Sequence, residues 1–248
     1  MRLFGPPSVK KLEAARDVVG LIEALQSDKT ARRIEASEAL GRLGDPSAGP
    51  ALVEALRDPA VRDAAAASLL MMAPEVMDVL VMTLRQANPL AREAAADPAV
   101  RTVVAQILGY AGDERAVEPL IGALDDVDEV GHAAIQALVN LKDPRAVTPL
   151  GERTVRYGAE AIQGLGDIGD PAGMAVVVEW VMPQSHVRTS ADDAAVAIRA
   201  LGKIGPPDMV VPFIRRIRHH FPGAGTPNGD IIQAAVVDAE ASLGESVG

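Results

Sequence analysis

Four aspartates recur in this 248-residue sequence within the same short frame, where they could hold a metal ion or act as acid–base groups. The clearest copy of the frame is Gly-x-x-Gly-Asp-Pro at residues 41–46. A carboxylate placed just before a helix also caps the first backbone N–H groups, and its charge suits the helix N-terminus. One capping carboxylate per unit explains the repetition with fewer assumptions. We therefore interpret as caps the set Asp45, Asp113, Asp143 and Asp170.

Other residue types that carry out chemistry are absent or scattered. The sequence has no cysteine, which excludes disulfides, thiolate catalysis and cysteine-ligated metals. It has no Gly-x-Ser-x-Gly turn of the kind that carries a nucleophilic serine. The glycines of residues 164–170 do not form a phosphate loop, because no Gly-Lys-Ser/Thr follows them. His132 opens a helical pattern and is predicted to be a surface or half-buried residue. We expect no catalytic residue, no metal site and no cofactor.

The recurring frame indicates a pair of helices. In residues 30–40, Ile34, Ser37 and Leu40 follow one another at spacings of three, which is a helical face. A glycine near the helix end permits the left-handed turn that stops it, and Asp-Pro starts the next helix. That second helix spans residues 47–56. One unit is therefore helix A, a tight turn and helix B.

The unit occurs seven times along the chain. Successive central residues of helix B are 31, 28, 40, 30, 27 and 36 positions apart, by difference of their numbers. A period of about 30 residues with two helices per unit predicts an all-α, right-handed α-solenoid, here a single domain over 1–248. The first repeat, 1–28, is partial and the last, 229–248, is incomplete. The predicted central residues are Leu21, Leu52, Leu80, Leu120, Leu150, Val177 and Phe213.

One copy of the unit can be compared with known repeats. Residues 36–56 read Ala-x-x-Ala-Leu-Gly-x-Leu-Gly-Asp-Pro-x-Ala-x-x-x-Leu-x-x-Ala-Leu, which resembles the HEAT-like repeats of the phycobilisome-lyase type. Residues 9–25 look like the opening of archaeal members of that family. The resemblance implies a helical solenoid and two kinds of function, bilin attachment or detachment and scaffolding. Iron-dependent hydroxylases built on such repeats use His-Glu pairs, which this sequence lacks.

Three links from helix B to the next helix A are extended, namely residues 85–97, 183–193 and 219–229. They fall at the same place in the unit, so in a solenoid they emerge along one edge. This edge is either a partner contact or a set of tolerated surface insertions. The segment Asp-Pro-Ala-Val-Arg occurs twice, and we expect its arginines, Arg62 and Arg101, to make hydrogen bonds between repeats.

The residue two positions after each helix-B centre is predicted to point outward, onto the concave side. Four of these seven residues are glutamates, so a basic partner segment would suit this face, although glutamate is also a common solvent-exposed helix former. At the C-terminal end, residues 213–220 instead gather arginines, predicted to point away from a core of Phe213, Ile214 and Ile217. The candidate partner-binding residues are Glu23, Glu54, Met82, Glu152, Glu179, Arg215 and Arg218.

The composition favours a protein partner. A net charge of −10 opposes binding to nucleic acids and anionic membranes, and no apolar run suggests a leader or a membrane span. We expect a cytoplasmic, non-catalytic scaffold or adaptor that binds another protein through the concave helix-B surface and the long-link edge. Self-association is a further possibility. The alternative is a bilin-lyase-like subunit that cradles a chromophore.

Overall fold

The computed structural model describes residues 6–86, 90–181, 190–219 and 226–244. All regular elements within these ranges are α-helices or short 3-10 helices, which confirms the all-α solenoid prediction. The chain divides into two compact units, Met1–Ala137 and Leu138–Gly248, and each is described by itself.

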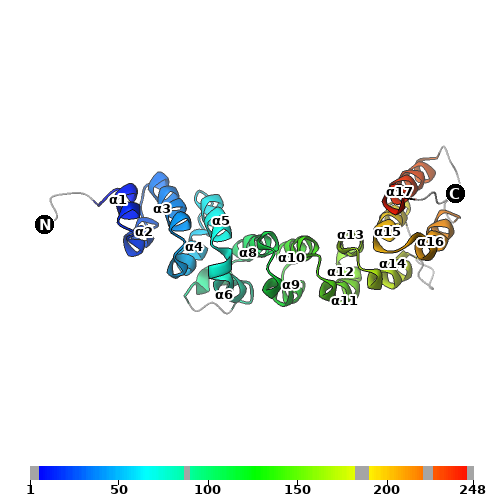
Figure 1. Ribbon diagram of the computed structural model, residues 1–248, viewed down its shortest axis with the longest axis horizontal. Helices are drawn as coiled ribbons and strands as arrows, with labels where there is room; N and C mark the ends of the chain where they lie inside the picture. Colours follow the sequence, from blue (N-terminus) through cyan, green and yellow to red (C-terminus); the bar gives the residue numbers. More distant parts are fainter. Residues whose placement is uncertain (1–5, 87–89, 182–189, 220–225, 245–248) are drawn as a thin grey trace. The chain divides into compact units, whose positions relative to one another are not determined.

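Helices of the first unit alternate between two layers (Figure 1). The helix-A layer holds α1, α3, α5 and α8, and each of these packs against the next. The helix-B layer holds α2, α4, α6 and α9, in which α4 packs on α6 and α6 on α9. The bounds are α1 Val9–Ala14, α2 Val18–Ala24, α3 Thr30–Leu43, α4 Gly49–Ala55, α5 Arg62–Met71, α6 Ala73–Leu84, α7 Arg92–Ala96, α8 Pro98–Ala111, α9 Val117–Ala123 and α10 Asp128–Leu141, which ends in the second unit.

The second unit repeats this arrangement. Its helix-A helices, α13, α15 and α17, pack in succession, and α14 packs on α16 in the helix-B layer. A single helical turn, α12, stands between α11 and α13. The bounds are α11 Val147–Glu152, α12 Thr154–Tyr157, α13 Ala159–Ile168, α14 Met174–Val181, α15 Ala191–Ile204, α16 Pro207–His219 and α17 Pro227–Leu243.

The predicted helix-B centres form the core, with one exception. Phe213 is only half-buried, and the buried face of α16 consists of Val210, Ile214 and Ile217. These three residues are spaced i, i+4 and i+7, so Ile214 takes the central position, one residue later than predicted. The prediction for Phe213 was wrong. Fully buried, as predicted, are Leu21, Leu52, Leu80, Leu120, Leu150 and Val177.

The four recurring aspartates are helix caps, as predicted. Each accepts a hydrogen bond from the backbone N–H two residues ahead, at 2.8–2.9 Å, and so starts a 3-10 turn that leads into helix B. The glycine before three of them, Gly44, Gly112 or Gly169, has φ between 67° and 77° and ends helix A. Lys142 takes this left-handed place in the fourth copy, with φ 52°. The 3-10 turns are Pro46–Ala48, Glu114–Ala116, Pro144–Ala146 and Pro171–Gly173.

We expect Asp170→Ala to lower the free energy of unfolding by about 1 kcal/mol, the usual value of an N-cap side chain. The change removes the 2.8 Å hydrogen bond from the Ala172 N–H at the entry to α14. Asp170→Asn keeps a side-chain oxygen at the same place and should lose much less. Urea unfolding followed by circular dichroism measures both; equal losses would show that capping is not the role of this side chain.

The first glycine of the Gly-x-x-Gly-Asp-Pro frame has a different role, which the amino-acid sequence alone does not reveal. Gly41, Gly109, Gly166 and Gly202 are buried inside helix A. A Cβ added to any of them would lie 2.5–2.9 Å from the Cα of Ser68, Ala137, Ala200 or Ala239, respectively, on the following helix A. Absence of a side chain therefore lets neighbouring helix-A backbones touch. At the equivalent place of α5, the sequence has Leu70.

The predicted long links are partly helical. Residues 92–96 of the first link form α7, which packs on α4, α6 and α8. The second and third links lie mainly outside the described residues, but α15 already begins at Ala191 and α17 at Pro227. The prediction that each of these ranges is a loop from end to end is therefore wrong.

Candidate functional site

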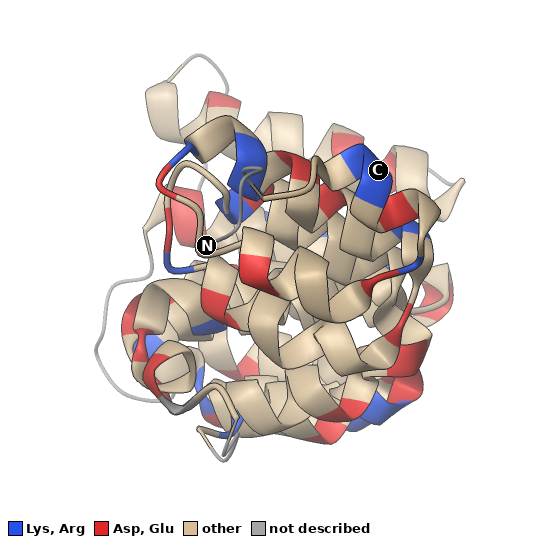
Figure 2. Cartoon of the chain, turned by 90° about the vertical axis from the view of Figure 1, so that its left-hand side faces the viewer, with Lys and Arg blue, Asp and Glu red and all other residues tan. Residues whose placement is uncertain are grey.

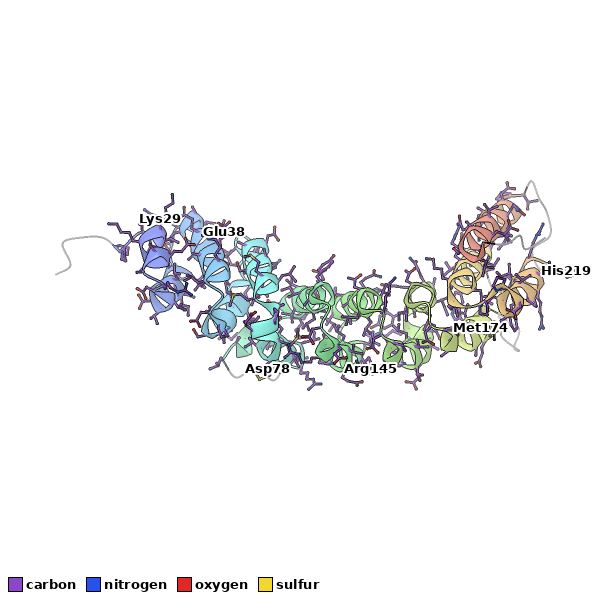
Figure 3. All side chains as sticks on the ribbon, viewed as in Figure 1. Lys29, Glu38, Asp78, Arg145, Met174 and His219 are labelled. Atoms are coloured by element: carbon purple, nitrogen blue, oxygen red, sulfur yellow. The ribbon has the colours of Figure 1, made fainter. Side chains whose placement is uncertain are left out.

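The helix-B layer of the first unit presents the predicted outward positions on its surface. Glu23 and Met82 are exposed, whereas Glu54 is half-buried. Asp78 on α6 lies at the lower side of this unit, opposite Glu38 on α3 of the helix-A layer (Figure 3). The helix-B layer therefore has its own outward face, and the concavity predicted for it stays a prediction.

Two carboxylates of this face were missed by the sequence analysis. Asp78 and Glu118 are exposed and lie two residues before the helix-B centres Leu80 and Leu120. Positions two before and two after a centre are four apart, hence one turn apart on the same helical face. In α6 and α9 the carboxylate occupies the position two residues before the centre, because the position two residues after it holds Met82 or Gly122. Each helix-B helix of the first unit thus carries one carboxylate at these two positions, and we call this set the acidic row: Glu23, Glu54, Asp78 and Glu118.

Glu54 is the member of the acidic row with contacts inside the chain. One of its carboxylate oxygens accepts a 3.4 Å hydrogen bond from the backbone N–H of Ala94 in α7, and the other lies 3.5 Å from Arg57 Nη1. The same Arg57 nitrogen donates to Glu93 at 2.7 Å. The half-burial of Glu54 therefore results from α7 and its link, which are 40 residues further along the chain.

An open groove of about 660 Å³ lies beside Glu54, between the residues that follow α2 and the C-terminal end of α4. Its walls are mostly polar. Arg33 reaches it from α3 and pairs with Asp58, with Nη2 2.7 Å from the carboxylate. Hydrogen bonds donated by the Ala60 N–H and by Arg33 hold the pKa of the Asp58 carboxyl below its ordinary value. The groove is lined by Leu25, Gln26, Ser27, Asp28, Arg33, Glu54, Ala55, Arg57 and Asp58.

Candidate residues of the second unit carry both signs of charge. Glu152, at the end of α11, is exposed and lies 3.6 Å from Arg153. Glu179 is exposed on α14. On α16, Arg215 is exposed and Arg218 is half-buried, so Arg218 does not point fully away from the core as predicted. Charged residues of both signs are distributed over the helices and links of the chain (Figure 2).

The arginines of the repeated segment are structural, as predicted. Arg62 Nε donates to the Leu56 carbonyl at 2.8 Å, and Arg101 Nη1 donates to the Ala95 carbonyl at 3.0 Å. Each arginine thereby joins helix A to the end of the preceding repeat. Arg101 also makes two 2.7 Å hydrogen bonds with the carboxylate of Asp126, in the link after α9, and both side chains are nearly inaccessible to solvent.

Metal-binding side chains do not gather among the residues that the structure describes. Among them, no group of three or more His, Cys, Asp or Glu side chains is placed to hold a metal ion. His132 is exposed, as predicted, and its Nδ1 contacts the backbone oxygen of Asp128. None of the helices within the described ranges combines the length and the apolar character needed to span a bilayer.

Comparison with known proteins identifies the class of this chain. The family described as HEAT repeats matches residues 18–97 and 90–157, more than half of the 248 residues, and the chain belongs to this family. Nothing among the curated protein sequences matches it.

Solved structures show a looser similarity. Human deoxyhypusine hydroxylase in complex with glycerol is 19% identical, with 95% of this chain and 88% of that chain covered and a TM-score of 0.41. An engineered protein is also 19% identical, with 96% and 74% covered and a TM-score of 0.45. Similarities at this level support no argument about function.

Proposed function

We propose that this HEAT-repeat chain is a non-catalytic interaction scaffold that binds a basic segment of another protein through its helix-B layer. The observation that supports this most is the acidic row, because each of the four helix-B helices of the first unit contributes a carboxylate to it. Carboxylates in a line complement lysines and arginines spaced along an extended or helical segment. Binding to polyanions such as nucleic acids is disfavoured by the same charges.

Rigidity of the layer supports the proposal. Three of the four helices that carry the row, α2, α4 and α9, follow a capping aspartate, and α6 packs on both α4 and α9, so the carboxylates keep their spacing before a partner arrives. When a surface is preorganised, less free energy is lost in ordering its side chains and loops during binding. In the second unit, Glu152 and Glu179 extend the acidic character to α11 and α14, while Arg215 on α16 suits an acidic group, including one on a second copy of the chain.

We expect the double variant Glu23→Lys/Glu118→Lys to reduce capture of the partner from a native extract at least tenfold, since two attractions become repulsions. Both residues are exposed. The measurement is affinity capture with quantitative mass spectrometry. Glu54 is left unchanged because its contacts with α7 and Arg57 would confuse a binding defect with a folding defect.

The matched control is Glu35→Lys/Asp63→Lys on α3 and α5 of the helix-A layer. It alters the net charge by the same amount, and Asp63, like Glu118, lies in the first turn of its helix. A partner that is kept by this control and lost by the helix-B variant would support the scaffold. Equal losses, or none, would contradict it. Glu152→Lys/Glu179→Lys makes the same comparison for the second unit.

The finer resemblance to phycobilisome-lyase and archaeal proteins supports a second role, in which the solenoid cradles a bilin. No contact within the described residues favours it, since the groove described above is lined with charged side chains. Retention of a coloured molecule by the purified chain, seen by absorbance and unaffected by the charge reversals, would favour this role over the scaffold.

A further inference from the structure

We propose that the groove between α2 and α4 binds the cationic side chain of an arginine or lysine on the partner segment. This inference rests on the proposed function and assigns one position of the acidic row, Glu54, to a defined receptor site. The groove is bounded by two consecutive links from helix B to helix A, so its two walls come from different repeats. A side chain entering it would therefore contact both repeats at once.

The charges around the groove leave an excess of negative charge. Among the residues that line the groove, two arginines, Arg33 and Arg57, stand against three carboxylates, so the formal charge of the lining is 2 − 3 = −1. One added cation reduces this excess without burying an unpaired charge. The three carboxylates are Asp28, Glu54 and Asp58.

Both arginines are already engaged by their own chain. Arg33 Nε donates to Asp58 at 2.9 Å and Arg33 Nη1 donates to the Ser27 carbonyl at 2.8 Å. Arg57 is held by Glu93 at 2.7 Å. An anionic ligand would have to separate these pairs to reach a guanidinium group. The pairs therefore favour a cation over an anion as the occupant.

Acceptor oxygens are available for a cation. Asp28 is exposed and makes no ion pair with any residue that the structure describes. Glu54 accepts a single long hydrogen bond of 3.4 Å, and its pairing distance to Arg57 is 3.5 Å, beyond the usual length of a charge-assisted bond. A planar guanidinium can reach two carboxylates at once, whereas an ammonium acts as a point charge. We expect arginine to bind more tightly than lysine.

The test is titration of the ¹⁵N-labelled full chain with N-acetyl-arginine amide, followed by amide chemical shifts. Saturable shifts are expected for the amides of residues 25–28 and 54–58, with much smaller shifts elsewhere. N-acetyl-citrulline amide has the same shape without the charge and should produce no saturable shift. Equal shifts with both compounds, shifts spread evenly over all acidic residues, or none at all would overturn the proposal.

Two variants complete the experiment. Asp28→Asn/Glu54→Gln keeps the shape of both side chains and should weaken arginine binding at least tenfold. Glu118→Gln, on the same layer but outside the groove, should leave it unchanged; a loss as large as that of the double variant would contradict a local site. If the groove fails this test while Glu23→Lys/Glu118→Lys still loses the partner, the scaffold stands and only the groove is wrong.

Discussion

Replacing Asp126 by alanine is expected to lower the free energy of unfolding by about 3–5 kcal/mol, the usual cost of removing one partner from a buried ion pair. Arg101 is 4% and Asp126 11% exposed, and two 2.7 Å hydrogen bonds join them. Without the carboxylate, the guanidinium keeps its hydrogen bonds to the carbonyls of Ala95 and Ala96 but loses the negative charge with which it is paired. Urea unfolding monitored by circular dichroism measures the loss.

An exposed pair of the same geometry is the control. In the first unit, Arg42 Nε donates to Glu13 at 2.7 Å, but the two side chains are 50% and 26% exposed. Exposed pairs contribute little because water and salt screen them. Glu13→Ala should therefore shift the unfolding midpoint by a small fraction of the Asp126→Ala shift. Similar shifts for both variants would show that burial does not determine the strength of the Arg101 pair.

The pH dependence has a definite sign. Burial opposes ionisation of Asp126, but hydrogen bonds from Arg101 and from the Val127 N–H outweigh it, so the pKa of Asp126 is lowered in the folded chain. A lowered folded pKa stabilises the protein above the unfolded pKa of about 3.9 and loses that stabilisation as pH falls through the folded value. The difference between wild type and Asp126→Ala should be constant near neutral pH and shrink only in acid.

The repeat frame was predictable because its signals are local. Asp170 caps a turn two residues ahead, and Gly169 adopts its left-handed conformation whatever the distant chain does. Six helix-B centres follow from periodicity alone. The seventh failed because Phe213 and Ile214 are adjacent apolar residues, so the sequence permits two registers, and packing selects the one with Ile214 inside.

Features that depend on distant residues were not predictable in the same way. Half-burial of Glu54 requires α7, 40 residues later, and α7 stands in a segment that had been interpreted as an open link. Asp78 and Glu118 could have been found from the sequence, since they lie one helical turn before the outward position that follows each helix-B centre by two residues. They were missed because only one outward position per helix was considered. The groove beside Glu54 joins side chains of two repeats and has no sequence signal.

Two glycine-to-alanine changes, one inside helix A and one on helix B, are predicted to have opposite effects on stability. Gly109→Ala places a Cβ 2.5 Å from the Cα of Ala137, a backbone atom that cannot move without shifting a helix. Overpacking of this kind costs about 1–3 kcal/mol. Alanine regains at most about 1 kcal/mol of helix propensity, so we expect a net loss of stability.

Gly122→Ala, on the exposed face of α9, is the matched substitution. Nothing lies within 4 Å of the added Cβ, so helix propensity is the term that remains and the variant should become more stable, by about 0.5–1 kcal/mol. Urea unfolding of both variants separates the two effects. If Gly109→Ala were stabilising as well, the helix-A backbones would not be in contact, and the first glycine of the frame would need another explanation. Opposite signs would show that glycine is required there for close packing between repeats, rather than for a turn.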